Sequence, residues 1–240
     1  MRLLTIFFMI FAVLILTLAV TGQIPQKTKI LIITGGHEFE REFFFNMFAA
    51  MPDIEFTSAE HPAANNIYAA EALENYDVLV YYDMNQDISE EQKKAFLQMV
   101  EKGKGLVFLH HSLASYQDWP EYMHIQGGRY HLDPQDTSKK STYKHDVQMD
   151  VKVLDPDHPV TKGIADFTIH DEVYENFEVL PTVHPLLKTD HPESGEIIGW
   201  AQQTGKTKSV TIQLGHDHFA YENENFSRLV YQAIRWGAGK

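Results

Sequence analysis

Apolar and polar segments alternate along the first half of the chain in a pattern typical of strands separated by helices. Short apolar runs that end in glycine or polar residues indicate buried strands, and longer segments with one apolar face indicate helices. This alternation predicts βαβ units, and therefore a parallel sheet with helices on both faces. The predicted strands are residues 29–35, 53–59, 77–83 and 105–111, and the predicted helices are residues 41–51, 69–76 and 89–102.

Two helices carry recognisable end signals. Ser89 and Gln92 have the spacing of a capping box, in which each side chain bonds the other residue's backbone N–H, and Gly103 ends that helix. Asn225 is expected to cap a closing helix that ends at Gly237.

The pattern changes after Ser112. Residues 116–142 are rich in aromatic residues, histidine, glycine and aspartate, and a loop this long inside a compact domain usually serves function. The remainder is mostly β, so we expect an α/β fold with a β-rich C-terminal half. The strands expected there are residues 147–155, 167–180, 196–203 and 208–217, with a hairpin turn at 204–206.

The N-terminus differs from the rest of the chain. Arg2 precedes an almost unbroken apolar run, Leu3–Val20, followed by small residues, which is typical of a secretory signal peptide over residues 1–22. A run of roughly 18–20 apolar residues also spans a bilayer, so an uncleaved membrane anchor is the alternative. We therefore expect an exported protein, periplasmic or secreted, with a single domain over residues 23–240, or else a membrane-anchored one.

Composition narrows the classes of function. Among 240 residues, 33 are Asp or Glu and 20 are Lys or Arg, for a net charge of −13. This charge argues against nucleic acid or an anionic membrane surface as a partner, and it leaves neutral ligands such as sugars open. The chain has no cysteine, which excludes disulfides, thiolate metal sites and a cysteine nucleophile.

Candidate chemistry gathers where four predicted strands end. Because the carboxyl ends of neighbouring parallel strands open onto one crevice, residues far apart in sequence should meet there. The polar residues at these ends are His37 and Glu38; His110, His111 and Ser112; His170, Asp171 and Glu172; and His216, Asp217 and His218.

Two of these groups have simpler structural alternatives. Adjacent side chains on a strand point to opposite sides, so one of His110 and His111 should face the cleft while the other packs or caps a helix. Asp171 and Glu172 form either an acid/base pair or a solvated acidic hairpin.

Seven segments follow one another along residues 29–239: ILIITGGHEFE, GLVFLHHSLAS, IQGGRYHLDP, DPDHPVTKGI, HDEVYENF, IIGWAQQTGKTKSVTIQLGHD and YQAIRWGAG. In this order they resemble the ThuA-like family, which is named for trehalose utilisation. The resemblance implies the fold of class I glutamine amidotransferase-like domains, a flavodoxin-like three-layer sandwich with a mostly parallel central sheet.

The resemblance also implies a role in sugar metabolism. The larger superfamily places a cysteine after the strand that ends here in LVFLHH, so the lack of cysteine excludes glutamine amidotransfer by a thiolate. Ser112 is a poor substitute nucleophile, because its surroundings lack the glycines of a nucleophile elbow. The site candidates in matching motif positions are His37, His110, His131, Glu172, His216 and Asp217.

These residues support an enzyme that acts on a di- or keto-saccharide by hydrolysis or elimination. In one route Glu172 and a histidine share general acid/base work. In the other, His110, His131 and His216 hold a divalent metal, zinc or manganese. The expected catalytic residues are His110, His111, Glu172, His216 and Asp217, and the expected ligand-binding residues are His37, His131, Asp171 and Trp200.

The alternative is a non-catalytic carbohydrate-binding or accessory domain that uses the same cleft. Trp200 would then stack on a sugar ring, although burial in the core explains a tryptophan equally well.

Overall fold

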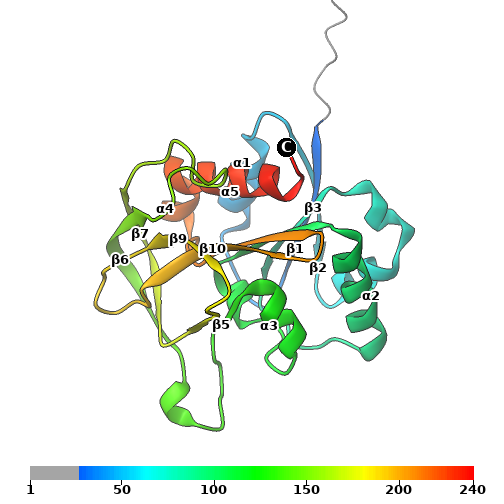
Figure 1. Cartoon of the computed structure of the whole chain (residues 1–240), viewed down its shortest axis with the longest axis horizontal. Coiled ribbons are helices and arrows are strands. Elements are labelled where there is room, and N and C mark those ends of the chain that lie inside the picture. The colour runs from blue at the N-terminus through cyan, green and yellow to red at the C-terminus, as the bar shows by residue number, and fades with distance from the viewer. Residues whose placement is uncertain (1–26) are drawn as a thin grey trace, which may run out of the picture.

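The computed structural model describes residues 27–240, and its centre is a nine-stranded sheet (Figure 1). The strand order is β2-β1-β3-β4-β11-β10-β9-β6-β7. The predicted signal or anchor, residues 1–22, lies outside the described residues. Within residues 27–240, no helix is both long and apolar enough to cross a membrane.

Five neighbouring strands form the parallel half of the sheet. Their central members are buried on both faces, which is why their sequences are continuous apolar runs rather than alternating ones. The strands are β2 (Ile54–Glu60), β1 (Thr28–Gly35), β3 (Val78–Asp83), β4 (Gly105–Leu109) and β11 (Thr207–Ile212). This half confirms the βαβ interpretation of the sequence.

The other half of the sheet is antiparallel. The hairpin predicted at 204–206 joins β10 (Ile197–Thr204) to β11, and this reversal switches the sheet from parallel to antiparallel. Four pairings are parallel and four are antiparallel, so the expectation of a mostly parallel sheet was too strong. The remaining strands are β9 (His184–Lys188), β6 (Thr142–Val153) and β7 (Phe167–Glu175).

Helices cover both faces of the sheet and make it a three-layer structure (Figure 1). α1 (Arg41–Ala49), α4 (His218–Tyr221) and α5 (Glu224–Gly237) pack with alternate strand residues such as Ile30 and Val80. α2 (Glu90–Lys102) and α3 (Pro120–Gln126) pack on the opposite face, against residues such as Leu31 and Tyr81. The period of two along each strand therefore assigns side chains to two separate cores.

Helix ends follow the expected rules with two differences. The capping box of Ser89 and Gln92 is present, and Gly103 adopts the left-handed conformation that ends α2. The cap of α5 is Asn223 rather than Asn225, and its side chain accepts the backbone N–H groups of Asn225 and Phe226. The predicted helix 69–76 is instead a 3₁₀ helix, η2 (Glu71–Asn75), preceded by a second one that was not predicted, η1 (Ala63–Ala69).

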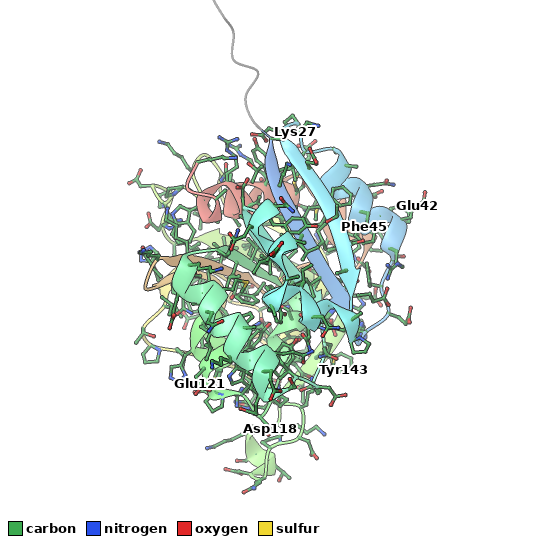
Figure 2. The ribbon with its side chains drawn as sticks, turned by 90° about the vertical axis from the view of Figure 1, so that its right-hand side faces the viewer. Lys27, Glu42, Phe45, Asp118, Glu121 and Tyr143 are labelled. Atoms are coloured by element: carbon green, nitrogen blue, oxygen red, sulfur yellow. The ribbon has the colours of Figure 1, made fainter. Side chains whose placement is uncertain are left out.

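The aperiodic segment, residues 116–142, follows η3 (His110–Ala114), and its part around η4 (Thr137–Lys139) protrudes from the body. The segment also contains α3 and β5 (Gly128–Arg129), and β5 pairs with β8 (Glu178–Val179). The part around η4 extends below the sheet in both views (Figures 1 and 2). It projects from the end of the molecule where the parallel strands finish.

Candidate functional site

Three of the predicted residues meet at this end of the sheet. His110 follows β4, His216 follows β11, and Glu172 comes from the edge strand β7. His110 Nε2 lies 2.8 Å from Glu172 Oε2, and His216 Nδ1 lies 3.1 Å from the same oxygen and 3.3 Å from His110 Nε2. His110 and Glu172 are buried, while the side chain of His216 is 23% exposed. Both acidic residues of the β7 pair are buried, so the solvated acidic hairpin was the wrong alternative.

The hydrogen bonds of His110 define what its inner nitrogen can do. Nδ1 lies 2.8 Å from the carbonyl oxygen of Gln213, which can only accept, so Nδ1 carries a proton. In the neutral ring, Nε2 then presents a lone pair to the Glu172 carboxylate, which is also acceptor-only. The Tyr174 hydroxyl, 3.0 Å from Nε2, can donate to that lone pair, and a cation between Nε2 and the carboxylate would satisfy both groups.

The three ligand-type atoms have the spacing that a metal ion requires. Two ligands at bond lengths of about 2.1 Å lie about 3.0 Å apart at right angles and about 3.4 Å apart at tetrahedral angles. Two of the observed separations, 3.1 and 3.3 Å, lie within this range, and the third, 2.8 Å, lies just below it. The bond from His110 Nδ1 to a backbone carbonyl is also the usual orienting contact of a metal-bound histidine.

Neighbouring groups hold the cluster in place. Asp171 is buried and accepts three backbone N–H groups, those of Glu172 at 2.8 Å, Gly215 at 2.7 Å and His216 at 2.9 Å. These bonds tie the edge strand β7 to the turn that follows β11. Asp171 therefore positions Glu172 and His216, and it is not among the residues that line the pocket, where it was expected to bind a ligand.

The electrostatics of the cluster favour opposite charges on its members. Burial by itself would raise the pKa of Glu172, but hydrogen bonds from His110 and His216 lower it well below its usual range. Burial opposes a charge on His216, yet Glu172 raises the pKa of that imidazole above its ordinary value. The carboxylate therefore stays ionised and attracts positive charge, whether protons or a metal ion.

The backbone at His110 is strained. Its φ is 50°, a left-handed conformation that a residue with a bulky side chain rarely adopts. The chain turns sharply at the end of β4 without the glycines that mark such a turn in sequence. Such strain concentrates at functional sites. Ser112 lies two residues on, and its buried hydroxyl finds no partner among residues 27–240, which gives no support to a nucleophilic role.

A pocket of about 240 Å³ adjoins the cluster. His37 and His111 form one side, with their rings 4.7 Å apart. His111 lines this pocket and His110 does not, so one of the two faces the cleft as expected, while His110 belongs to the adjoining cluster. Burial, and the nearby His110 and His37, hold the pKa of His111 well below its usual value, so this ring is neutral. The remaining lining residues are Met84, Ala114, Tyr130, Leu132, Tyr143, His145, Glu172 and Tyr174.

His145 was missed by the sequence reasoning. Its Nδ1 lies 3.7 Å from Glu172 Oε1, and its ring is 4.5 Å from that of His216. It sits where β6 shifts register against β7, between Lys144 and Val147, and Asp146 there has φ of 57°. The only signal in the sequence was a histidine just before an alternating strand, which is too common to single out.

Besides Asp171, three predicted residues belong neither to the cluster nor to the pocket lining. His131 Nε2 lies 3.4 Å from Glu178 Oε2, outside the His/Glu cluster. The three groups with the spacing of metal ligands are therefore His110, Glu172 and His216, not His110, His131 and His216. Asp217 caps α4 by accepting the N–H of Phe219. Trp200 is fully buried and donates its indole N–H to Gln126, so it offers no face to a sugar.

Trp200 lies directly beneath two glycines. A side-chain carbon at Gly127 would come within 2.6 Å of the indole nitrogen, and one at Gly128 within 2.8 Å of the ring carbons. The backbone at these glycines therefore packs directly against the indole ring. The residues that follow, Tyr130 and Leu132, line the pocket.

Comparisons with known proteins agree with this fold. A ThuA-like protein from Parabacteroides merdae superposes with a TM-score of 0.74 at 19% identity, covering 90% of this chain and 91% of that one. One from Bacteroides uniformis gives 0.66 at 20% identity, covering 88% and 91%. PurLQS from Thermotoga maritima gives 0.59 at 13% identity, covering 88% and 99%. These likenesses show the class I glutamine amidotransferase-like fold.

A search of curated proteins finds no match. The family model described as "ThuA: Trehalose utilisation" matches residues 29–237, nearly all of the described chain. The chain therefore belongs to the ThuA family.

Proposed function

We propose that this protein is a metal-dependent enzyme that cleaves a bond of a neutral di- or keto-saccharide by hydrolysis or elimination. One observation carries the proposal: two imidazole nitrogens and a carboxylate oxygen converge at 2.8–3.3 Å beside a pocket. The link of the ThuA family to trehalose utilisation supports a sugar as the substrate.

The pocket lining supports a neutral substrate. It contains three tyrosines but no lysine or arginine among the residues that the structure describes. Tyrosine rings pack against the C–H face of a sugar while their hydroxyls reach polar groups. Phosphate or carboxylate groups on the substrate would instead call for arginine or lysine.

The ligands would be His110 Nε2, His216 Nδ1 and Glu172. A divalent ion held there supplies a Lewis acid that polarises a sugar carbonyl or activates a water molecule. The chain itself orients these ligands: Gln213 fixes the tautomer of His110, and Asp171 fixes the backbone of His216.

His145 is placed to exchange a proton with a bound sugar. It lines the pocket, and its side chain is 47% exposed, whereas His110 is buried behind Glu172. In hydrolysis, water adds across the glycosidic C–O bond and the leaving oxygen takes up a proton. In elimination from a keto-sugar, the same bond breaks while the carbon beside the carbonyl loses its proton. Both reactions need one proton-carrying group beside the pocket.

The test begins with metal content. Protein purified without chelator should contain close to one zinc or manganese ion per chain, and His216→Ala should lose it. His131→Ala is the matched control, because His131 lies outside the cluster, and it should retain the metal. A panel of disaccharides and keto-sugars then tests turnover. Sugar binding without product, unchanged by His110→Ala, would favour the non-catalytic binding domain instead.

We further propose export to the periplasm or beyond, with membrane anchoring as the alternative, on the basis of the N-terminal apolar run alone. Sequencing the N-terminus of the mature protein tests this. A chain that still begins at Met1 would rule out cleavage.

A further inference from the structure

The geometry points to a second sugar subsite beside the pocket, so that the substrate of this enzyme is a disaccharide bound across two adjacent hollows. This inference rests on the proposed function and specifies the size of its substrate. The first subsite is the pocket next to the His/Glu cluster, and the second is formed by the protruding segment and the start of β6.

The two hollows share a wall. The second has a volume of about 410 Å³. Three of its residues, Tyr130, Leu132 and Tyr143, also line the first pocket. A ligand that fills the first pocket therefore meets the second without leaving the protein surface. The residues that line only the second hollow are Lys140, Ser141 and Thr142.

The volumes favour joint occupancy. Pockets for small molecules typically occupy about 300–1,000 Å³. The first pocket, at about 240 Å³, is below this range by itself, and the two hollows together fall within it. A disaccharide that is too large for the first pocket would therefore extend into the neighbouring hollow.

The lining chemistry of the second hollow suits a sugar. Tyr143 is 60% exposed, one of few large apolar side chains on the surface of residues 27–240. Figure 2 shows it at the surface in the lower part of the molecule. Its ring lies 5.0 Å from that of His145, which links it to the reacting end of the pocket. Lys140 and Thr142 add hydrogen-bond donors at the far side of the hollow.

The second hollow is preformed. The Tyr130 hydroxyl donates to the carbonyl of Ser141 at 3.2 Å, and the Ser141 hydroxyl donates to the carbonyl of Asn176 at 3.0 Å. The Asn176 amide donates to the carbonyl of Lys140 at 3.0 Å. These bonds connect the protruding segment to Asn176, directly after β7, so binding a second ring orders little additional chain.

The experiment compares one-ring and two-ring probes. Calorimetry measures the affinities of trehalose, maltose, cellobiose and lactose, and of glucose and galactose, for the metal-loaded protein. The best-bound disaccharide should bind more tightly than either monosaccharide. Lys140→Ala changes only the second hollow and should reduce that preference by about threefold to tenfold, the value of one hydrogen bond. Thr142→Trp fills the same hollow and should abolish the preference. Monosaccharide affinity should stay the same.

Lys139→Ala is the matched control. It removes the neighbouring lysine, which lines a different hollow, and should leave the preference unchanged. Sugars of both sizes binding equally, with no effect of either variant, would overturn the second subsite alone. No binding of any sugar together with no turnover would overturn the proposed function and this inference with it.

Discussion

Asp171→Asn tests how the cluster is held together. The wild-type carboxylate accepts three backbone N–H groups, two of them from the turn that carries His216. Asparagine has nearly the same shape but replaces one acceptor oxygen with an NH₂ group. That group would face the N–H of Gly215, now 2.7 Å from Oδ2, and leave two buried donors opposed.

The expected cost follows from these contacts. An unsatisfied buried donor costs about 1–3 kcal/mol, and the two remaining bonds lose their charge assistance, at about 1 kcal/mol each. Burial raises the pKa of Asp171, so removing its charge also recovers part of this free energy. We expect a net loss of about 2–4 kcal/mol from the free energy of unfolding, a large part of the 5–15 kcal/mol typical of a domain.

Urea unfolding in the presence of chelator measures this loss without a contribution from metal. With a slope of about 2–3 kcal/mol/M, the midpoint should fall by about 1 M. Asp217→Asn is the matched control: it makes the same chemical change beside His216, but asparagine caps a helix as well as aspartate does, so the midpoint should barely move. Equal midpoints for wild type and Asp171→Asn would refute the role assigned to these hydrogen bonds.

Three further outcomes follow from the structure. Trp200→Phe should lower the free energy of unfolding by about 2–3 kcal/mol, because the smaller ring leaves a cavity in the core and the carbonyl of Gln126 keeps only its bond from Thr211; equal stability in urea unfolding would contradict this packing. Ser89→Ala should cost about 0.5–2 kcal/mol through loss of the α2 cap, and Ser89→Asp should restore it. The hydrogen bond from His184 lowers the pKa of Asp155 below its ordinary 3.8, so the stability it adds is present above that pH and is lost as the pH falls through the folded value. Melting temperatures of wild type and Asp155→Asn should therefore differ at pH 6 and converge only as the pH falls below 3.8, toward the lowered pKa of the folded state; a constant difference would refute this.

The sequence predicted the convergence of His110, Glu172 and His216, but for an incomplete reason. His110 and His216 meet because they follow neighbouring parallel strands, as expected. Glu172 arrives from β7, an antiparallel edge strand at the far end of the strand order, which Asp171 ties to the turn after β11. The sequence pattern of β7 does not indicate this contact, because the contact depends on how the sheet curves.

The residues that sequence reasoning misplaced share a physical cause. Type and position relative to a strand end identify a capable side chain but not the direction in which it points. Asp217 follows a strand as His216 does, yet it turns to cap α4. Trp200 is in the middle of β10 and faces the core, and His145 faces the pocket only because β6 changes register beside it. Such directions are set by tertiary packing.

Trp200 should nevertheless affect ligand binding, although it lies beneath the backbone that leads into the pocket rather than in the pocket itself. The indole lies between the sheet and the backbone at Gly127 and Gly128, and its size sets the distance between that backbone and the core. A smaller side chain at this position would let the backbone at residues 127–130 move toward the core, and Tyr130 would move with it. Substitutions in the core beneath the pocket should therefore change which sugars the pocket binds, although they touch no sugar.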